Sequence, residues 1–122
     1  MEDRLSRMRL MIGEKNLKKL QKAHVCVVGC GAVGSFAIEA LARAGIGHLT
    51  LIDFDSVSVS NINRQLFALN STVGQEKTLV AQNRILDIVN NTLLEMKKLI
   101  NHELLFDIMI IKIYKKLYSN EQ

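Results

Sequence analysis

The sequence predicts an α/β fold: a Rossmann-like βαβ unit with two amino-terminal helices, an incomplete parallel sheet and a divergent carboxyl-terminal tail. An apolar run at residues 25–28 leads directly into the glycine pattern GCGAVG at 29–34, and a helical pattern follows. A second apolar run, 49–52, ends in Asp53, which lies about twenty residues beyond the glycines. Strand, glycine turn, helix, strand and terminal acid in this order are typical of a parallel βαβ crossover.

The segment before the first strand predicts two short helices. Apolar residues recur at helical spacing through residues 5–20, and Gly13 interrupts the pattern, so we expect the helices to join there. Arg4, Arg7 and Arg9 lie on the first helix, and several lysines lie on the second. This periodicity predicts a solvated, basic face.

Each glycine of the turn has a physical reason. Gly29 allows the tight turn off the strand, Gly31 lets a phosphate approach the backbone, and Gly34 lets the helix pack closely on the strand. The helix then presents free N–H groups to an anion, and the carboxylate of Asp53 would accept hydrogen bonds from ribose hydroxyls. The pattern predicts nucleotide binding, with a purely structural glycine turn as the alternative.

The segment at 56–69 should leave the carboxyl edge of the sheet, where open α/β folds bind their ligands. Its polar centre contains Asn61, Arg64 and Gln65. An arginine and two amides beside a phosphate-binding turn suit a polyphosphate, although the same residues are also ordinary at the start of a helix. We expect them to face the phosphates.

Lys77 lies in the first turn of a further predicted helix. The apolar face of this helix is expected to comprise Leu79, Val80, Ile85, Leu86 and Val89. A cation at this end of a helix opposes the helix dipole unless an anion shares the site. The position of Lys77 therefore predicts a phosphate contact.

Composition indicates one domain in a chain of 122 residues, with a modest and scattered net charge of +4. No apolar run reaches the roughly 20 residues that span a bilayer. The start also lacks a signal-peptide core, so we expect a cytoplasmic protein without a membrane partner.

Cys26 and Cys30 have no paired ligands for zinc. We expect Cys26 to fill the core and Cys30 to fill the turn.

Four phrases in this order, GCGAVGS, LTLIDFD, SNINRQ and STVGQEK, resemble the ThiF/MoeB superfamily of ubiquitin-activating-enzyme-like adenylating proteins. The phrases EALARAGIGHLTLID and SNINRQ are most similar to its tRNA threonylcarbamoyladenosine dehydratases. The resemblance implies ATP-dependent adenylation of a carboxylate. In these dehydratases the carboxylate belongs to the threonyl group on a tRNA adenosine, and a ring closure then expels AMP.

The resemblance also implies which residues bind ATP. They are Gly29, Gly31, Ala32, Gly34, Asp53, Asp55, Asn61, Arg64, Gln65 and Lys77. Ala32 stands where many members have a glycine. Asp53 would hold the ribose hydroxyls, and Asp55 would complete a DxD motif. Lys77 would neutralise the triphosphate.

The catalytic charges would come from Arg64, Lys77 and Arg7 together with Mg²⁺, whose ligand in this chain is unknown. Arg7 would reach into the ATP site of the partner protomer in a homodimer, and Leu5 replaces the aromatic residue usual between the two amino-terminal arginines. Attack of a carboxylate on the α-phosphate joins an anion to a polyanion, so the site must concentrate positive charge. Besides tRNA as substrate, the resemblance implies a sulfur-acceptor protein as a partner.

The resemblance ends after residue 88. We expect residues 1–88 to form the amino-terminal part of a ThiF-type nucleotide-binding domain and residues 89–122 to form a divergent tail, mostly helical or mixed. The family's magnesium-binding aspartate has no match, so we expect a truncated chain. Two alternatives stay open: a non-catalytic nucleotide-binding or dimerisation fragment, and an NAD-dependent oxidoreductase, since the same βαβ unit binds NAD.

Overall fold

The computed structural model describes residues 3–89. Its elements follow in the order α1 (Ser6–Lys22), β1 (His24–Val28), α2 (Ala32–Ala44), β2 (His48–Ile52), η1 (Val59–Asn61), η2 (Asn70–Thr72) and α3 (Lys77–Val89), where η marks a 3₁₀ helix. The expectations for the tail from Asn90 onward lie outside these residues. Within 3–89, no helix has the length and apolar character needed to cross a membrane.

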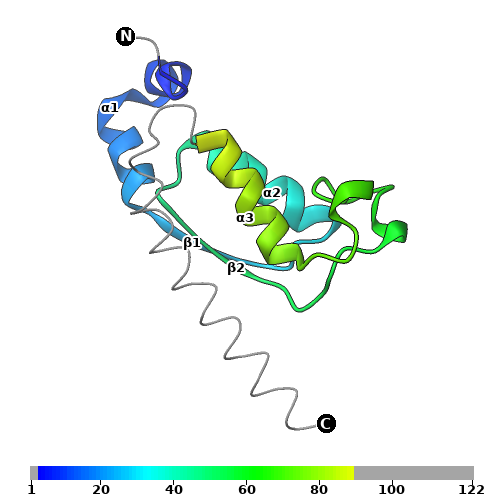
Figure 1. The fold of residues 1–122 in the computed structure, drawn as a ribbon. Helices are drawn as coiled ribbons and strands as arrows, with labels where there is room; N and C mark the ends of the chain where they lie inside the picture. The colour runs from blue at the N-terminus through cyan, green and yellow to red at the C-terminus, as the bar shows by residue number, and fades with distance from the viewer. Residues whose placement is uncertain (1–2, 90–122) are drawn as a thin grey trace, which may run out of the picture.

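β1 and β2 form a parallel pair joined by α2, which confirms the predicted βαβ crossover and the α/β fold class. The register pairs His24 with His48 and Val28 with Ile52. α2 and α3 lie side by side on one face of the pair, and α1 lies beyond the end at which the strands begin (Figure 1). α1 therefore lies at the opposite end of the sheet from the carboxyl ends of the two strands (Figure 1).

Side chains of β1 alternate between the two faces of the sheet. Val25 and Val27 pack against the core, whereas Cys26 and Val28 are exposed. The expectation that Cys26 fills the core is therefore wrong. A strand that is covered by helices on one face places every second residue outside the core, even when the whole run is apolar.

The core lies between the sheet and the helices α2 and α3. Its buried residues are Cys30, Ile38, Ala42, Leu49, Leu51, Val57, Phe67, Ala68, Val80, Ala81 and Ile85. The sequence places Leu79 on the apolar face of α3, but this residue is 43% exposed. Val80 and Ile85 are buried as predicted, and Val89 packs against the core. Thr78 and Ala81 complete the inward face of α3.

Gly13 divides α1 into two helical segments, as the sequence predicts, because its φ of 79° and ψ of 158° are not helical. The start of α1 is anchored to the end of α2. Leu5 is buried against Gly45, where an added Cβ would come within 3.0 Å of Leu5 Cδ2. The Arg4 guanidinium donates a hydrogen bond of 3.0 Å to the carbonyl of Ala42. These contacts fix the amino-terminal helix at the end of the sheet where the strands begin.

An ion-pair cluster joins α2 to α3. The Glu39 carboxylate accepts two hydrogen bonds of 2.9 Å from the Arg84 guanidinium and two more, at 3.0 and 2.8 Å, from Arg43. Hydrogen bonding by Arg84, with a smaller contribution from Arg43, lowers the pKa of Glu39 to about 2. The cluster fixes α3 against α2 and so helps to place the first residue of α3.

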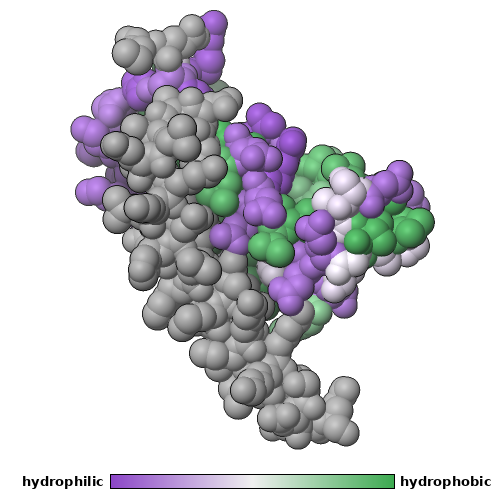
Figure 2. Space-filling view, in the orientation of Figure 1, coloured by the Kyte–Doolittle hydropathy of each residue, from purple (hydrophilic) through white to green (hydrophobic). Residues whose placement is uncertain are grey.

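The segment between β2 and α3 lies beyond the carboxyl ends of both strands (Figure 1). It contains the two short 3₁₀ helices and exposes apolar side chains on the face seen in Figure 2. Val59 and Leu69 are both more than half exposed. The carboxyl edge of the sheet, where the sequence predicts ligand binding, is thus bordered by this irregular segment.

Candidate functional site

The glycine turn leaves β1 at its carboxyl end and starts α2. Gly29 has a φ of +95°, and its N–H donates to the carbonyl of Ile52 at 2.7 Å, so the turn stays paired with the neighbouring strand. Gly34 packs so closely that an added Cβ would lie 1.7 Å from the Gly29 carbonyl oxygen. The local backbone requires both glycines, one for its conformation and the other for lack of space.

The amino terminus of α2 is open to an anion. This helix begins at Ala32, and its N-cap, Gly31, makes no side-chain capping bond. The amides of a first helical turn have no partner within the helix, and their partial positive charge favours an anion. A Cβ added to Gly31 would lie 3.6 Å from Nε2 of Gln65. An anion at this turn would therefore meet helix amides and a side-chain amide.

Asp53 follows β2, and its carboxylate lies against the glycine turn. Oδ2 accepts a hydrogen bond from the N–H of Cys30 at 2.7 Å, and Oδ1 accepts one from the N–H of Asp55 at 2.8 Å. Burial and the negative charge of Asp53 raise the pKa of the Cys30 thiol to about 12. Cys30 is buried and stays protonated, which fits its expected role as a filler of the turn. The sequence predicts the position of Asp53 but not these backbone contacts.

Lys77 is the first residue of α3 and is buried. Its Nζ lies 3.2 Å from Oδ2 of Asp55, and its backbone N–H donates to the Asp55 carbonyl at 3.0 Å. The Lys77 side chain is 9% exposed, whereas that of Asp55 is 75% exposed. A buried ammonium group needs a partner of opposite charge. Here the partner stands at the surface, where a bound anion can compete with it for Lys77.

Ser35 ties the segment after β2 to α2, a role that the sequence reading overlooks. This residue is fully buried, and its hydroxyl accepts the N–H of Leu66 at 3.0 Å and donates to the carbonyl of Ala32. The bond to Leu66 places the neighbouring Gln65, also buried, beside the turn. The sequence feature that could have predicted this role is the position of Ser35, a polar residue directly after the last glycine of the turn in a mostly apolar helix.

Asn61 and Arg64 have local roles. Asn61 is buried, and its Oδ1 accepts the N–H of Ser58 at 2.9 Å as part of the cap of η1. Arg64 is exposed, and its Nη1 donates to the carbonyl of Ser60 at 2.8 Å. Among the described contacts, neither side chain makes a hydrogen bond to the glycine turn. Gln65 thus lies against the glycine turn and Lys77 pairs with Asp55, whereas Asn61 and Arg64 make hydrogen bonds within their own segment.

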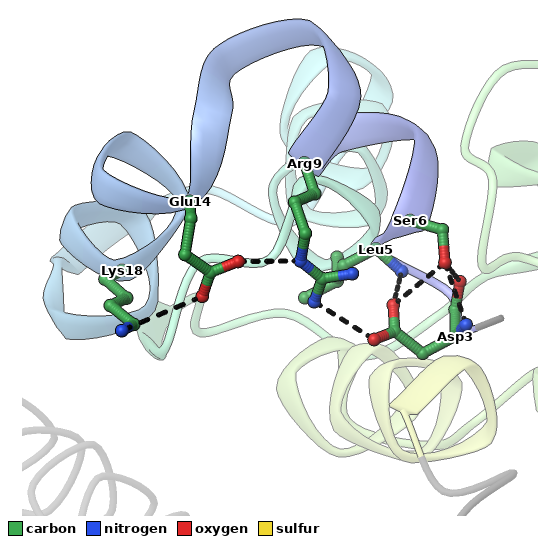
Figure 3. A network of polar contacts seen from close by, with 6 residues as sticks. All are labelled: Asp3, Leu5, Ser6, Arg9, Glu14 and Lys18. Atoms are coloured by element: carbon green, nitrogen blue, oxygen red, sulfur yellow. Dashed lines mark hydrogen bonds and ion pairs between the residues drawn. The ribbon is translucent and has the colours of Figure 1, made fainter. Parts of the chain in front are cut away.

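The amino-terminal arginines differ in what they contact. Arg9 forms ion pairs of 3.1 Å with Asp3 and 2.8 Å with Glu14, which brace the start of α1 (Figure 3). Arg4 is bound to α2. Arg7 is exposed, and within residues 3–89 it has no hydrogen bond or ion pair through its side chain. In its own chain it lies on α1, at the opposite end of the sheet from the glycine turn (Figure 1).

Comparison with known proteins identifies relatives of this unit. The ThiF family model matches residues 3–108. A tRNA threonylcarbamoyladenosine dehydratase of Haemophilus influenzae is 56% identical over 70 residues, which are 57% of this chain and 27% of that protein. The Bacillus subtilis protein of the same name is 53% identical over 83 residues, 68% of this chain and 33% of that protein.

A solved structure shows the same fold. The Escherichia coli tRNA N6-threonylcarbamoyladenosine dehydratase TcdA in complex with ATP aligns with a TM-score of 0.70 at 50% identity, over 71% of this chain and 36% of that chain. This chain thus spans between 27% and 36% of the length of these relatives. The family match includes every element from α1 to α3 and confirms the resemblance seen in the four sequence phrases. The chain therefore belongs to the ThiF family.

Proposed function

We propose that the carboxyl edge of the sheet binds ATP and that the chain takes part in the ATP-dependent adenylation of a carboxylate. This proposal rests on one observation: the uncapped amino terminus of α2 and the buried ammonium group of Lys77 lie at the same edge of the sheet. Asp53 is hydrogen-bonded to Cys30 in the turn and to Asp55, and Asp55 pairs with Lys77. Both electropositive features therefore belong to one connected set of contacts.

The residues at this edge fit a nucleoside triphosphate. The phosphates would lie against Gly31 and the first amides of α2, where no capping side chain competes for them. Each oxygen of Asp53 retains a lone pair that can accept a ribose hydroxyl. Lys77 would turn from Asp55 toward the phosphates. The E. coli relative is solved in complex with ATP, which supports the same ligand here.

Adenylation requires positive charge more than covalent chemistry by the protein. A carboxylate that attacks the α-phosphorus of ATP forms an acyl-adenylate and releases pyrophosphate. Because two anions meet in this step, groups that are charged and positioned beforehand lower its barrier. Lys77 supplies such a charge from inside the fold. Arg64 would add another by leaving the carbonyl of Ser60 and reaching the phosphates.

The carboxylate that we propose is the threonyl carboxylate of threonylcarbamoyladenosine in tRNA. The support is the name shared by the relatives at 56% and 53% identity. Ring closure onto the activated carbonyl would expel AMP and leave the dehydrated base. The binding energy of the tRNA would hold the reacting groups in place.

We assign Arg7 to the ATP site of a second copy of the chain. Its side chain is exposed, while the neighbouring Arg4 and Arg9 are both engaged. Because α1 and the glycine turn lie at opposite ends of the sheet (Figure 1), Arg7 would serve a partner subunit rather than its own chain. This assignment implies a homodimer.

Magnesium would supply further charge at the phosphates of bound ATP, since Mg²⁺ prefers phosphate, water and carboxylate oxygens. Residues 3–89 contain no group of three or more side chains suited to hold a metal ion. We therefore assign no protein ligand to the ion.

A nucleotide-binding or dimerisation unit without turnover is the second candidate. It is favoured by the fact that the chain spans 27% and 33% of the two curated relatives, so the edge described here corresponds to part of a larger protein. Both candidates predict ATP binding. They differ in whether bound ATP is converted to an adenylate.

Calorimetric titration of the purified chain with ATP, AMP and NAD, each with and without Mg²⁺, tests the proposed site. We expect ATP to bind more tightly than NAD and Mg²⁺ to strengthen ATP binding. Tighter binding of NAD would indicate a dinucleotide site instead, and a failure to bind all three would reject the proposal. Exchange of labelled pyrophosphate into ATP in the presence of tRNA then separates turnover from binding alone.

A further inference from the structure

On the basis of the proposed ATP site, we infer that Asp53 is a positioning residue that joins the two halves of the phosphate-binding edge, apart from any contact with ribose. One carboxylate oxygen binds the N–H of Cys30 at 2.7 Å, and the other binds the N–H of Asp55 at 2.8 Å. A single side chain therefore links the turn after β1 to the segment after β2.

The first bond fixes the glycine turn. Cys30 stands between Gly29 and Gly31, and glycine backbones have little steric restriction of their own. The turn leads directly into the amides of α2 that would hold the phosphates. Cys30 is 2% exposed, and a buried N–H without an acceptor is costly. The bond to Asp53 therefore gives the turn one fixed point at its centre.

The second bond places Lys77. With its N–H held by Asp53, Asp55 accepts the backbone N–H of Lys77 at 3.0 Å and contacts Nζ of the same lysine at 3.2 Å. The position of Asp55 thus determines where the buried ammonium group lies. Removing the Asp53 carboxylate would disturb the helix amides and the lysine together.

This arrangement requires a carboxylate at position 53. Both contacts are donated by backbone N–H groups, so both oxygens must accept, and a carboxylate has only acceptors. Asparagine could accept one of these bonds, but its NH₂ group would then face the other N–H. Because each carboxylate oxygen can accept a second hydrogen bond, ribose can bind without breaking either contact.

Two probes separate the positioning role from a ribose contact. Tripolyphosphate carries phosphates without ribose, and adenosine carries ribose without phosphates. If Asp53 only held ribose, Asp53→Asn would weaken adenosine binding and leave tripolyphosphate binding unchanged or tighter, because a negative charge near a polyanion is removed. The positioning role predicts instead a loss of tripolyphosphate affinity of about tenfold or more, as expected for a lost charge-assisted hydrogen bond.

The experiment compares the wild type, Asp53→Asn and Asp87→Asn by calorimetry with ATP, adenosine and tripolyphosphate. Asp87 is exposed in the last turn of α3, about 15 Å along the helix from Lys77. Asp87→Asn removes the same charge away from the edge and should leave all three affinities unchanged. A loss of tripolyphosphate affinity in Asp53→Asn alone supports the inference. Unchanged or tighter tripolyphosphate binding overturns it.

Amide hydrogen exchange tests the same contacts even if the wild type binds none of these ligands, a result that would reject the proposed function by itself. In the wild type, the amides of Cys30 and Asp55 should exchange about tenfold or more slower than the amide of Ala32, which no side chain caps. In Asp53→Asn at least one of the two should lose this protection. Equal rates for Cys30 and Ala32 in the wild type, or full protection in the variant, would overturn the inference. If the variant does not fold, the wild-type comparison still decides.

Discussion

Replacing Gly34 with alanine should destabilise the chain, because the new methyl group has no room. Its Cβ would lie 1.7 Å from the carbonyl oxygen of Gly29 and 2.7 Å from the carbonyl carbon. Real Cβ atoms essentially never approach closer than 3.0 Å, so α2 or the turn must give way by more than an ångström. The obstructing atoms belong to the backbone and cannot rotate aside as a side chain would. The shift would also loosen the packing of Ile38 on the sheet.

The expected loss follows from two opposing effects. Overpacking costs about 3 kcal/mol at the upper end of its usual range, which applies here because backbone is displaced. Alanine is a better helix former than glycine by about 1 kcal/mol. We therefore expect Gly34→Ala to lower the free energy of unfolding by about 2 kcal/mol. Urea unfolding followed by circular dichroism measures this change.

Gly31→Ala is the matched control. At Gly31 the nearest atom to a new Cβ is Nε2 of Gln65 at 3.6 Å, an ordinary contact with a side chain rather than with backbone. Gly31→Ala should therefore lower the free energy of unfolding by less than Gly34→Ala does, because it displaces no backbone atom. Phosphate binding should weaken, because the Cβ would stand where a ligand approaches the backbone. Equal stability of the Gly31 and Gly34 variants would refute the packing explanation.

Three further outcomes are expected. Glu39→Gln should lower the free energy of unfolding at neutral pH by about 1–2 kcal/mol, a value reduced by solvent screening around the half-exposed Arg84 and Arg43. Because folding lowers the pKa of Glu39 to about 2, the extra stability of the wild type over the variant should be complete above pH 4.5, the ordinary pKa, and should vanish as the pH falls to about 2. Urea unfolding midpoints of both proteins across this pH range measure the difference. A stability difference that persists below pH 2 would contradict the role given to the Glu39 carboxylate. Lys77→Ala should weaken ATP binding more than adenosine binding in calorimetry, and equal losses would place the lysine away from the phosphates. If the chain turns over, mixing Arg7→Ala with Lys77→Ala chains should restore part of the activity, whereas no restoration between variants shown to dimerise would count against Arg7 acting across the interface.

The sequence predicts those features of the fold that depend on local backbone preference. Helical spacing interrupted at Gly13 predicts a joint in α1, and the structure has non-helical dihedral angles there. The glycine pattern likewise predicts the turn and its close packing at Gly34. Burial is predicted less well. Cys26 and Leu79 are apolar and lie in apolar segments, yet both are exposed, because their burial depends on which faces the other elements cover.

For the candidate site, the sequence alone determined the order of its parts: a glycine turn after one strand, an acid after the next, and a lysine at the start of the following helix. The partners of these groups follow from how the separate segments pack in three dimensions. The structure shows that Asp53 binds the N–H of Cys30, that Asp55 meets the buried Lys77, and that Glu39 on α2 holds α3. The physical reason is that periodicity and glycine positions act over a few neighbouring residues, whereas these polar contacts join residues at least twenty-two positions apart. Such partners are set by the way the strands and helices pack together, which brings separate segments of the chain to the same edge of the sheet.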